Sequence, residues 1–207
     1  MANTSAPFGL RPVRNANGTP WTGKPGHYYL PTSDTHVVFI GDPVDVVGTS
    51  NTTEVVCLGG TFPPGTLQTV THATLADTNF VSGVVVGFEA VTRDSTTYRE
   101  ASTDRIALIA PAWDPNIVFR LRDDGSGVIG TALVGANANL VAGAGGSTVT
   151  GKSTWMLDAT TPAADATFQV TILRAANIFD NDATLASAVW DVQINLPQPF
   201  PAIVGFA

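Results

Sequence analysis

The sequence predicts an all-β protein: a β-sandwich or jelly-roll-like body with an extended N-terminal arm and an extended C-terminal tail. Short β-branched and aromatic runs recur along it, with turn residues roughly every 8–12 positions. Only one short segment is typical of a helix, and no repeat of about 20–50 residues indicates a propeller or solenoid. We expect the arm over 1–33, the body over 34–196 and the tail over 197–207.

The strands of the body are expected where apolar residues alternate with polar ones or form short buried runs. In 117–122, Ile117, Phe119 and Leu121 alternate with two arginines, so one face of this strand should be buried and the other exposed. The segment 190–196 alternates in the same way. The further expected strands are 36–40, 44–47, 54–58, 80–91, 105–110, 153–157 and 168–173.

Two local predictions concern single segments. The run 80–91 has the strongest strand pattern, and its period of two places four apolar side chains on one face: Phe80, Val84, Val86 and Phe88. The segment 182–189 is the one expected helix, with an N-cap at Asp180, Asn181 or Asp182.

Charge is scarce and unevenly distributed. Only 13% of the residues are charged, and the net charge is −7. Residues 1–33 contain three basic residues and no acid, giving +3, whereas the remainder has 7 basic and 17 acidic residues, giving −10. An acidic body argues against general nucleic-acid binding, and a basic arm fits an acidic protein surface.

Several features bear on compartment and chemistry. Cys57 is the only cysteine, which excludes an intrachain disulfide, and its apolar neighbours predict a buried thiol. The first 20 residues do not have the pattern of a signal peptide, and no apolar run is long enough for a membrane span. We therefore expect assembly in a host cytoplasm and no membrane partner.

The N-terminal arm carries the candidate binding residues. Pro7, Pro12 and Pro20 favour an extended chain, because proline fixes φ and restricts the residue before it. Apolar and basic side chains are spaced along this segment, which is typical of a chain that lies on another surface. The predicted partner-binding residues are Phe8, Leu10, Arg11, Arg14 and Trp21, and the predicted subunit contacts in the apolar tail are Phe200, Ile203 and Phe206.

A P-loop enzyme and a sugar-binding module are the alternatives. Gly146–Ser153 matches the phosphate-binding pattern G-x-x-x-x-G-K-[ST], but β-branched and aromatic residues follow where a P-loop begins its helix. A loop that leads into a strand is the preferred interpretation. Trp113 or Trp155 could stack on sugars if exposed, although core packing is more usual in strands. No metal, cofactor or catalytic set is expected from the spacing of His, Asp and Glu.

Over most of its length the chain resembles the capsid cement (decoration) proteins of tailed bacteriophages. The motifs that carry the resemblance are Ala6–Arg14 (APFGLRPVR), Gly18–Trp21 (GTPW), Phe39–Val44 (FIGDPV), Val84–Glu89 (VVVGFE) and Asp180–Asp182 (DND). The resemblance implies a non-enzymatic virion protein on the outer capsid surface that binds the major capsid protein and bridges neighbouring capsomers. It also implies self-association as dimers or trimers without deciding between them; we expect a homotrimer, with a homodimer possible. A sugar- or receptor-binding module of a tail or cell surface remains the alternative function.

Overall fold

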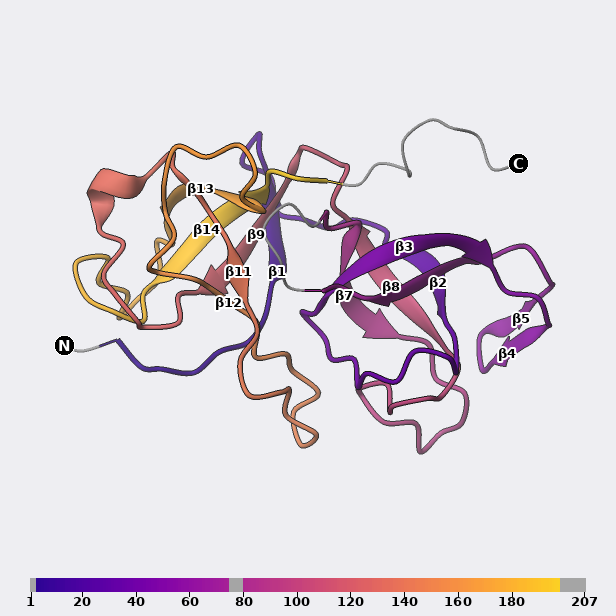
Figure 1. Cartoon of the computed structure of the whole chain (residues 1–207). Helices are drawn as coiled ribbons and strands as arrows, with labels where there is room; N and C mark the ends of the chain where they lie inside the picture. Colours follow the sequence, from indigo (N-terminus) through magenta and orange to yellow (C-terminus); the bar gives the residue numbers. More distant parts are fainter. Residues whose placement is uncertain (1–2, 75–79, 198–207) are drawn as a thin grey trace.

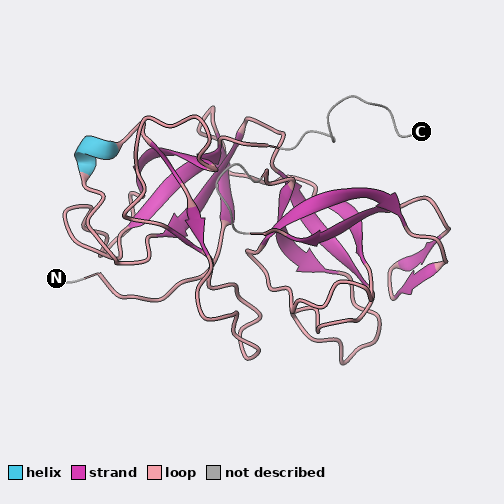
Figure 2. Ribbon diagram, in the orientation of Figure 1, coloured by secondary structure: helices cyan, strands magenta, loops and turns pink. Residues whose placement is uncertain are grey.

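The computed structural model describes residues 3–74 and 80–197, and it is nearly all β with several antiparallel sheets. The predicted all-β, sandwich-like class is therefore confirmed. In the described residues the only helical element is one 3-10 turn, η1 (Thr131–Leu133). Figure 1 shows two β lobes side by side, and Figure 2 shows how much of the chain between the strands is loop.

The first lobe, here called the barrel lobe, is a closed barrel in the strand order β2-β6-β3-β7-β8. The pair β2–β6 is parallel, and the other pairs are antiparallel. A small hairpin of β4 and β5 extends from the barrel at the end away from the second lobe (Figure 1). The strands are β2 (Gly26–Leu30), β3 (Pro43–Ser50), β4 (Val55–Cys57), β5 (Gly60–Phe62), β6 (Gln68–His72), β7 (Gly83–Phe88) and β8 (Arg105–Pro111).

The second lobe, here called the sheet lobe, is a five-stranded antiparallel sheet in the order β1-β9-β14-β13-β10. A two-stranded ladder of β11 and β12 packs beside it. The observed β9 has the bounds that its alternating pattern predicts. The strands are β1 (Arg11–Asn15), β9 (Ile117–Arg122), β10 (Asn137–Ala138), β11 (Leu140–Val141), β12 (Met156–Leu157), β13 (Val170–Ala175) and β14 (Val189–Ile194).

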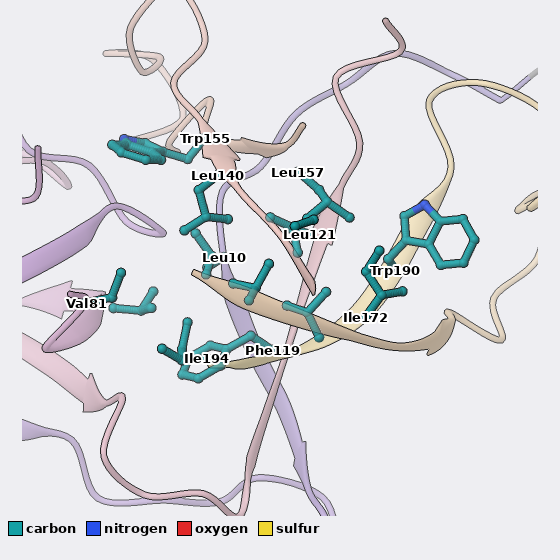
Figure 3. Close-up of a cluster of buried hydrophobic side chains, with 14 of the residues drawn as sticks. Leu10, Val81, Phe119, Leu121, Leu140, Trp155, Leu157, Ile172, Trp190 and Ile194 are labelled. Carbon is teal, nitrogen blue, oxygen red and sulfur yellow. The ribbon is translucent and has the colours of Figure 1, made fainter. Parts of the chain in front are cut away.

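Strands β7 and β8 form a wall between two hydrophobic cores. On β7, Val84 belongs to the core of the sheet lobe, while its neighbour Val85 belongs to the core of the barrel. On β8, Ala110 and Ile109 divide in the same way. Figure 3 shows the sheet-lobe core, where side chains from several strands meet around Phe119. Burial on both faces explains why 80–91 has the most continuous apolar pattern in the chain.

The predicted single apolar face of 80–91 was wrong. A β-bulge shifts the register between Val85 and Gly87, so the alternation does not run through the strand. Val86 consequently packs against the sheet-lobe core and Phe88 against the barrel core, while Phe80 lies outside the strand and is 51% exposed.

The predicted helix over 182–189 was also wrong. Its cap chemistry is present, because the Asp182 carboxylate accepts hydrogen bonds from the backbone and hydroxyl of Thr184. However, Asn181 binds the backbone of Val189 and Ala176 through its side chain, and this ties the segment into a loop. Ser187 has φ 61, which a helix cannot accommodate, and β14 begins two residues later.

The N-terminal region differs from a free arm. It is extended, but residues 11–15 form the edge strand β1 and residues 26–30 form β2 of the barrel. The chain is also tied down before β1, since the Asn3 side chain bonds the backbone of Asp182 and Ala186. Leu10 is 2% exposed and lies in the sheet-lobe core (Figure 3). The N-terminal segment is therefore part of the folded body.

Leu10→Ala tests this integration. Removing a buried leucine side chain should lower the free energy of unfolding by about 2–5 kcal/mol, because apolar contacts are lost and a cavity remains. Val149→Ala is the control, since Val149 is 92% exposed and its truncation should change stability by less than about 0.5 kcal/mol. Urea unfolding of both variants measures the difference, and equal effects would show that residue 10 does not belong to the core.

Candidate functional site

Three backbone segments cross where the two lobes meet. The Leu10 amide donates to the Gly41 carbonyl at 2.9 Å, and the Ser153 amide donates to the Ile40 carbonyl at 2.9 Å. Gly9 and Gly41 are required here, because both have positive φ (73° and 99°) and lie against backbone. A Cβ on Gly9 would lie 2.8 Å from the Gly41 carbonyl oxygen, and one on Gly41 would lie 2.9 Å from the Phe8 carbonyl oxygen. We call this crossing the lobe junction.

A buried carboxylate, Asp42, lies at the lobe junction. It is 2% exposed, its Oδ2 accepts from the Phe39 amide at 2.7 Å, and it is hydrogen-bonded to the Ser153 side chain. His72 Nε2 lies 3.8 Å from the same oxygen. Burial raises the pKa of Asp42 to about 6, although the hydrogen bonds from Ser153 and Phe39 oppose this shift. Burial also raises the pKa of Asp45, on β3, to about 6.

A second polar cluster lies beside the first and centres on Asp34. His36 bonds Asp34 Oδ1 through its ring at 2.8 Å and stacks on His72 with ring centroids 5.0 Å apart. Burial favours a higher pKa for Asp34, but hydrogen bonds from the backbone and ring of His36 and the backbone of His72 outweigh it and lower the pKa. Arg99 is fully buried and donates to the carbonyls of His36 and Thr103, which fixes the 36–40 segment against the barrel. Sequence spacing gave no signal for this cluster, because Asp34 and His36, His72 and Arg99 come from three separate segments.

The structure separates the predicted partner-binding residues into two groups. Arg11 is exposed, Phe8 is partly buried, and Trp21 is partly buried and packs against the sheet-lobe core. Leu10 and Arg14 instead make contacts within the chain, Leu10 in the core and Arg14 in an ion pair. Their role in partner binding stays a prediction. The predicted subunit contacts Phe200, Ile203 and Phe206 lie outside the described residues.

Arg14 belongs to a cluster of three arginines around one aspartate. Asp191 on β14 is fully buried, and its carboxylate is 3.1 Å from Arg14 Nη2, 2.8 Å from Arg120 Nε and 3.1 Å from Arg174 Nε. The arginines come from β1, β9 and β13, so one carboxylate connects four adjacent strands. The alternating sequence patterns placed Arg120 and Asp191 on polar faces but could not show that these faces coincide.

The P-loop-like segment has a different local geometry from a nucleotide site. The Ser147 amide bonds the Lys152 carbonyl and the Gly151 amide bonds the Ser147 carbonyl, which closes the segment into a tight turn. Lys152 then forms a parallel bridge with Ile40. The next regular element is β12 (Met156–Leu157), not a helix whose N-terminus could face a phosphate. The preferred interpretation, a loop leading into a strand, is confirmed.

The structure also places the single cysteine and the two tryptophans that were considered for sugar stacking. Cys57 is buried, as expected. Trp155 is 3% exposed and packs in the core, and Trp113 is partly buried with its ring edge-on to Tyr28 at 6.4 Å, so neither forms an open stacking surface. Within residues 3–74 and 80–197, no three His, Cys, Asp or Glu side chains are grouped so as to hold a metal ion. No helix of this part is long and apolar enough to cross a bilayer.

Comparison with known proteins gave no match to a family model, to a curated protein or to a solved structure. The resemblance to capsid cement proteins therefore rests on the short motifs alone.

The stability of the lobe junction should depend on pH through Asp42. Its folded pKa, about 6, lies above the ordinary value of 3.8, so the folded state binds the proton more tightly. This contribution to stability is fully present below pH 3.8 and is lost as the pH rises through 6, by up to about 3 kcal/mol.

Asp42→Asn, which cannot titrate, provides the measurement. The difference in unfolding free energy, wild type minus variant, should fall between about pH 4 and pH 6 and then stay level. Asp94→Asn, the same substitution at an exposed site, is the control. A flat difference for Asp42→Asn would contradict a raised folded pKa.

Asp191→Asn should destabilise the sheet lobe. It leaves the three arginines close together without the carboxylate that pairs with them, and the expected loss is about 2–4 kcal/mol because the arginines are partly solvated. Thermal or urea unfolding measures it, with Asp94→Asn again as the exposed control. A loss below about 0.5 kcal/mol would mean that the ion cluster contributes nothing to folding.

Proposed function

We propose that this protein is a structural, non-enzymatic virion protein that binds the outer surface of an assembled phage capsid. In this proposal it bridges neighbouring major capsid proteins and stabilises the head against the pressure of packaged DNA. Copies associate with one another, with a homotrimer favoured over a homodimer. The assembled virion surface is its location, and neither nucleic acid nor membrane is a partner.

The observation that carries the proposal is the way in which the basic N-terminal segment is presented. Leu10 anchors it from inside and β1 pairs it with β9, so Arg11 is exposed beside the partly buried Phe8, while Trp21 presents its accessible side and packs its other side on the core. A pre-ordered segment loses less conformational entropy on binding than a free arm does. The +3 charge of residues 1–33 on a chain whose remainder is −10 favours an acidic protein surface as the partner.

Because many copies bind one capsid, each individual contact can be weak and the assembly still binds tightly. Each capsid carries the same site many times, and association between copies makes further contacts intramolecular, which raises the apparent affinity. In this proposal Leu10 and Arg14 support the segment, while Phe8, Arg11 and Trp21 contact the capsid.

The test is binding to heads assembled without this protein. The wild type should co-sediment with such heads to a saturating number of copies and raise the temperature at which they disrupt. Phe8→Ala should weaken binding at least about fivefold, because a partly buried aromatic contact is lost. Leu58→Ala is the apolar control, since Leu58 is 61% exposed in the β4–β5 hairpin at the far end of the barrel (Figure 1).

Point variants are preferable to removing residues 1–21, because that deletion also removes β1 and the core residue Leu10. Failure of the folded wild type to co-sediment at saturating concentration would overturn the proposal. Equal losses for Phe8→Ala and Leu58→Ala would show that the N-terminal segment is not the contact.

A further inference from the structure

One face of the five-stranded sheet gathers half of the basic side chains of the chain. Register places Arg11 opposite Arg120, Arg120 opposite Asp191, and Asp191 opposite Arg174, so these residues form a row across β1, β9, β14 and β13. We call this surface the arginine face; its members are Arg11, Arg14, Arg120, Arg122, Arg174 and Asp191.

The arginine face is opposite the core. On the same strands, Phe119, Trp190 and Ile172 point to the other side, into the packed interior of the sheet lobe (Figure 3). The arginine side chains stay accessible: those of Arg14 and Arg120 are 22% exposed and that of Arg174 is 49% exposed.

The charge of this face is far from balanced. Five guanidinium groups and one carboxylate give the arginine face a formal charge of +4. Because the net charge of the chain is −7, all other side chains together carry −11. Apart from Asp191, the nearby acidic residues lie beside the sheet; Asp180 and Asp182 are on the loop that Asn181 ties to Val189, the first residue of β14. The positive area is thus compact and has acidic edges.

Asp191 orders the arginine face for binding. It fixes three guanidinium groups through one nitrogen of each, and Arg122 is fixed separately by donating through Nη1 to the Ser187 carbonyl. A guanidinium group has five N–H donors in a planar fork that matches a carboxylate, so donors remain on the other nitrogens. Fixed arginines lose little side-chain entropy when a ligand binds.

We propose that the arginine face docks a short carboxylate-rich segment of a protein partner. This inference rests on the proposed function, in which the partner is the capsid surface, and extends the contact from the N-terminal segment to the whole outer sheet face. Charge complementarity identifies the ligand, because the face lacks the carboxylates that would balance it. A long polyanion such as nucleic acid would meet the acidic remainder of the chain, whereas a short acidic segment fits within the compact positive area.

The first experiment uses a hexaglutamate peptide at low ionic strength, with hexaglutamine as the neutral comparison. The wild-type protein should bind hexaglutamate and not hexaglutamine. Arg11→Glu should weaken the binding at least about fivefold, because it replaces attraction with repulsion at the exposed β1 end of the row, beside Arg120. Arg93→Glu changes the net charge equally at an exposed loop outside the face, and should weaken binding less than about twofold.

Arg174→Gln is a second variant at the opposite end of the row, and it should also weaken peptide binding. Melting temperatures of the three variants confirm that each is folded. If Arg11→Glu and Arg93→Glu weaken binding equally, only overall charge matters and the proposal is wrong. If an oligonucleotide of the same charge binds more tightly than hexaglutamate and loses affinity with Arg11→Glu, the assigned ligand class is wrong.

The same variants on heads separate this inference from the proposed function. If the wild type binds heads and Arg11→Glu binds equally well, the arginine face is not the capsid contact, while the proposed function stands. If the wild type binds hexaglutamate as expected but not heads, the proposed function fails and the arginine face remains a carboxylate-binding surface.

Discussion

The crossing of three backbone segments at the lobe junction is the constraint on which the rest of the structure depends. Residues 8–10, 39–42 and 151–153 meet there at distances that leave no room for side chains on Gly9 and Gly41. Because the segments belong to the N-terminus, the barrel lobe and the sheet lobe, one contact fixes the positions of all three. The N-terminal segment can then enter the sheet as β1, which brings Arg11 opposite Arg120 before the register shifts between Pro12 and Arg14.

The wall formed by β7 and β8 makes the two lobes one packing unit. Adjacent residues on each strand enter different cores, so a displacement of either strand disturbs both. The buried polar groups Asp42 and Arg99 lie at the edge of this arrangement, where loops rather than strands supply the hydrogen-bond partners. Lobe packing and loop geometry are therefore coupled through hydrogen bonds as well as through apolar contact.

Sequence patterns predicted the position of the two alternating strands β9 and β14 well, although residues on their polar faces, such as Val118 and Asp191, are buried too. β9 has its expected bounds, and β14 begins one residue before its expected start. Prediction failed where tertiary contacts override local preference, as in the bulge of β7 and the loop fixed by Asn181. The N-terminal segment is extended as expected, but its pairing with β9 was not predicted. The candidate sites were only partly visible. The alternating sequence patterns identified Arg120 and Asp191 as residues on polar strand faces. They could not show that the contacts of Asp191 join four strands that are distant in sequence.

The arginine face contains a pair of like charges that lowers the stability of the folded chain. Arg11 lies directly opposite Arg120, and like charges at opposed positions of an antiparallel pair are destabilising. Asp191 offsets part of this repulsion, but a glutamate at position 11 would remove it and would leave the ion pair between Arg120 and Asp191 in place. Natural proteins depart from such local rules mainly at functional surfaces. In the proposed complex, the partner supplies the missing carboxylates and relieves this repulsion.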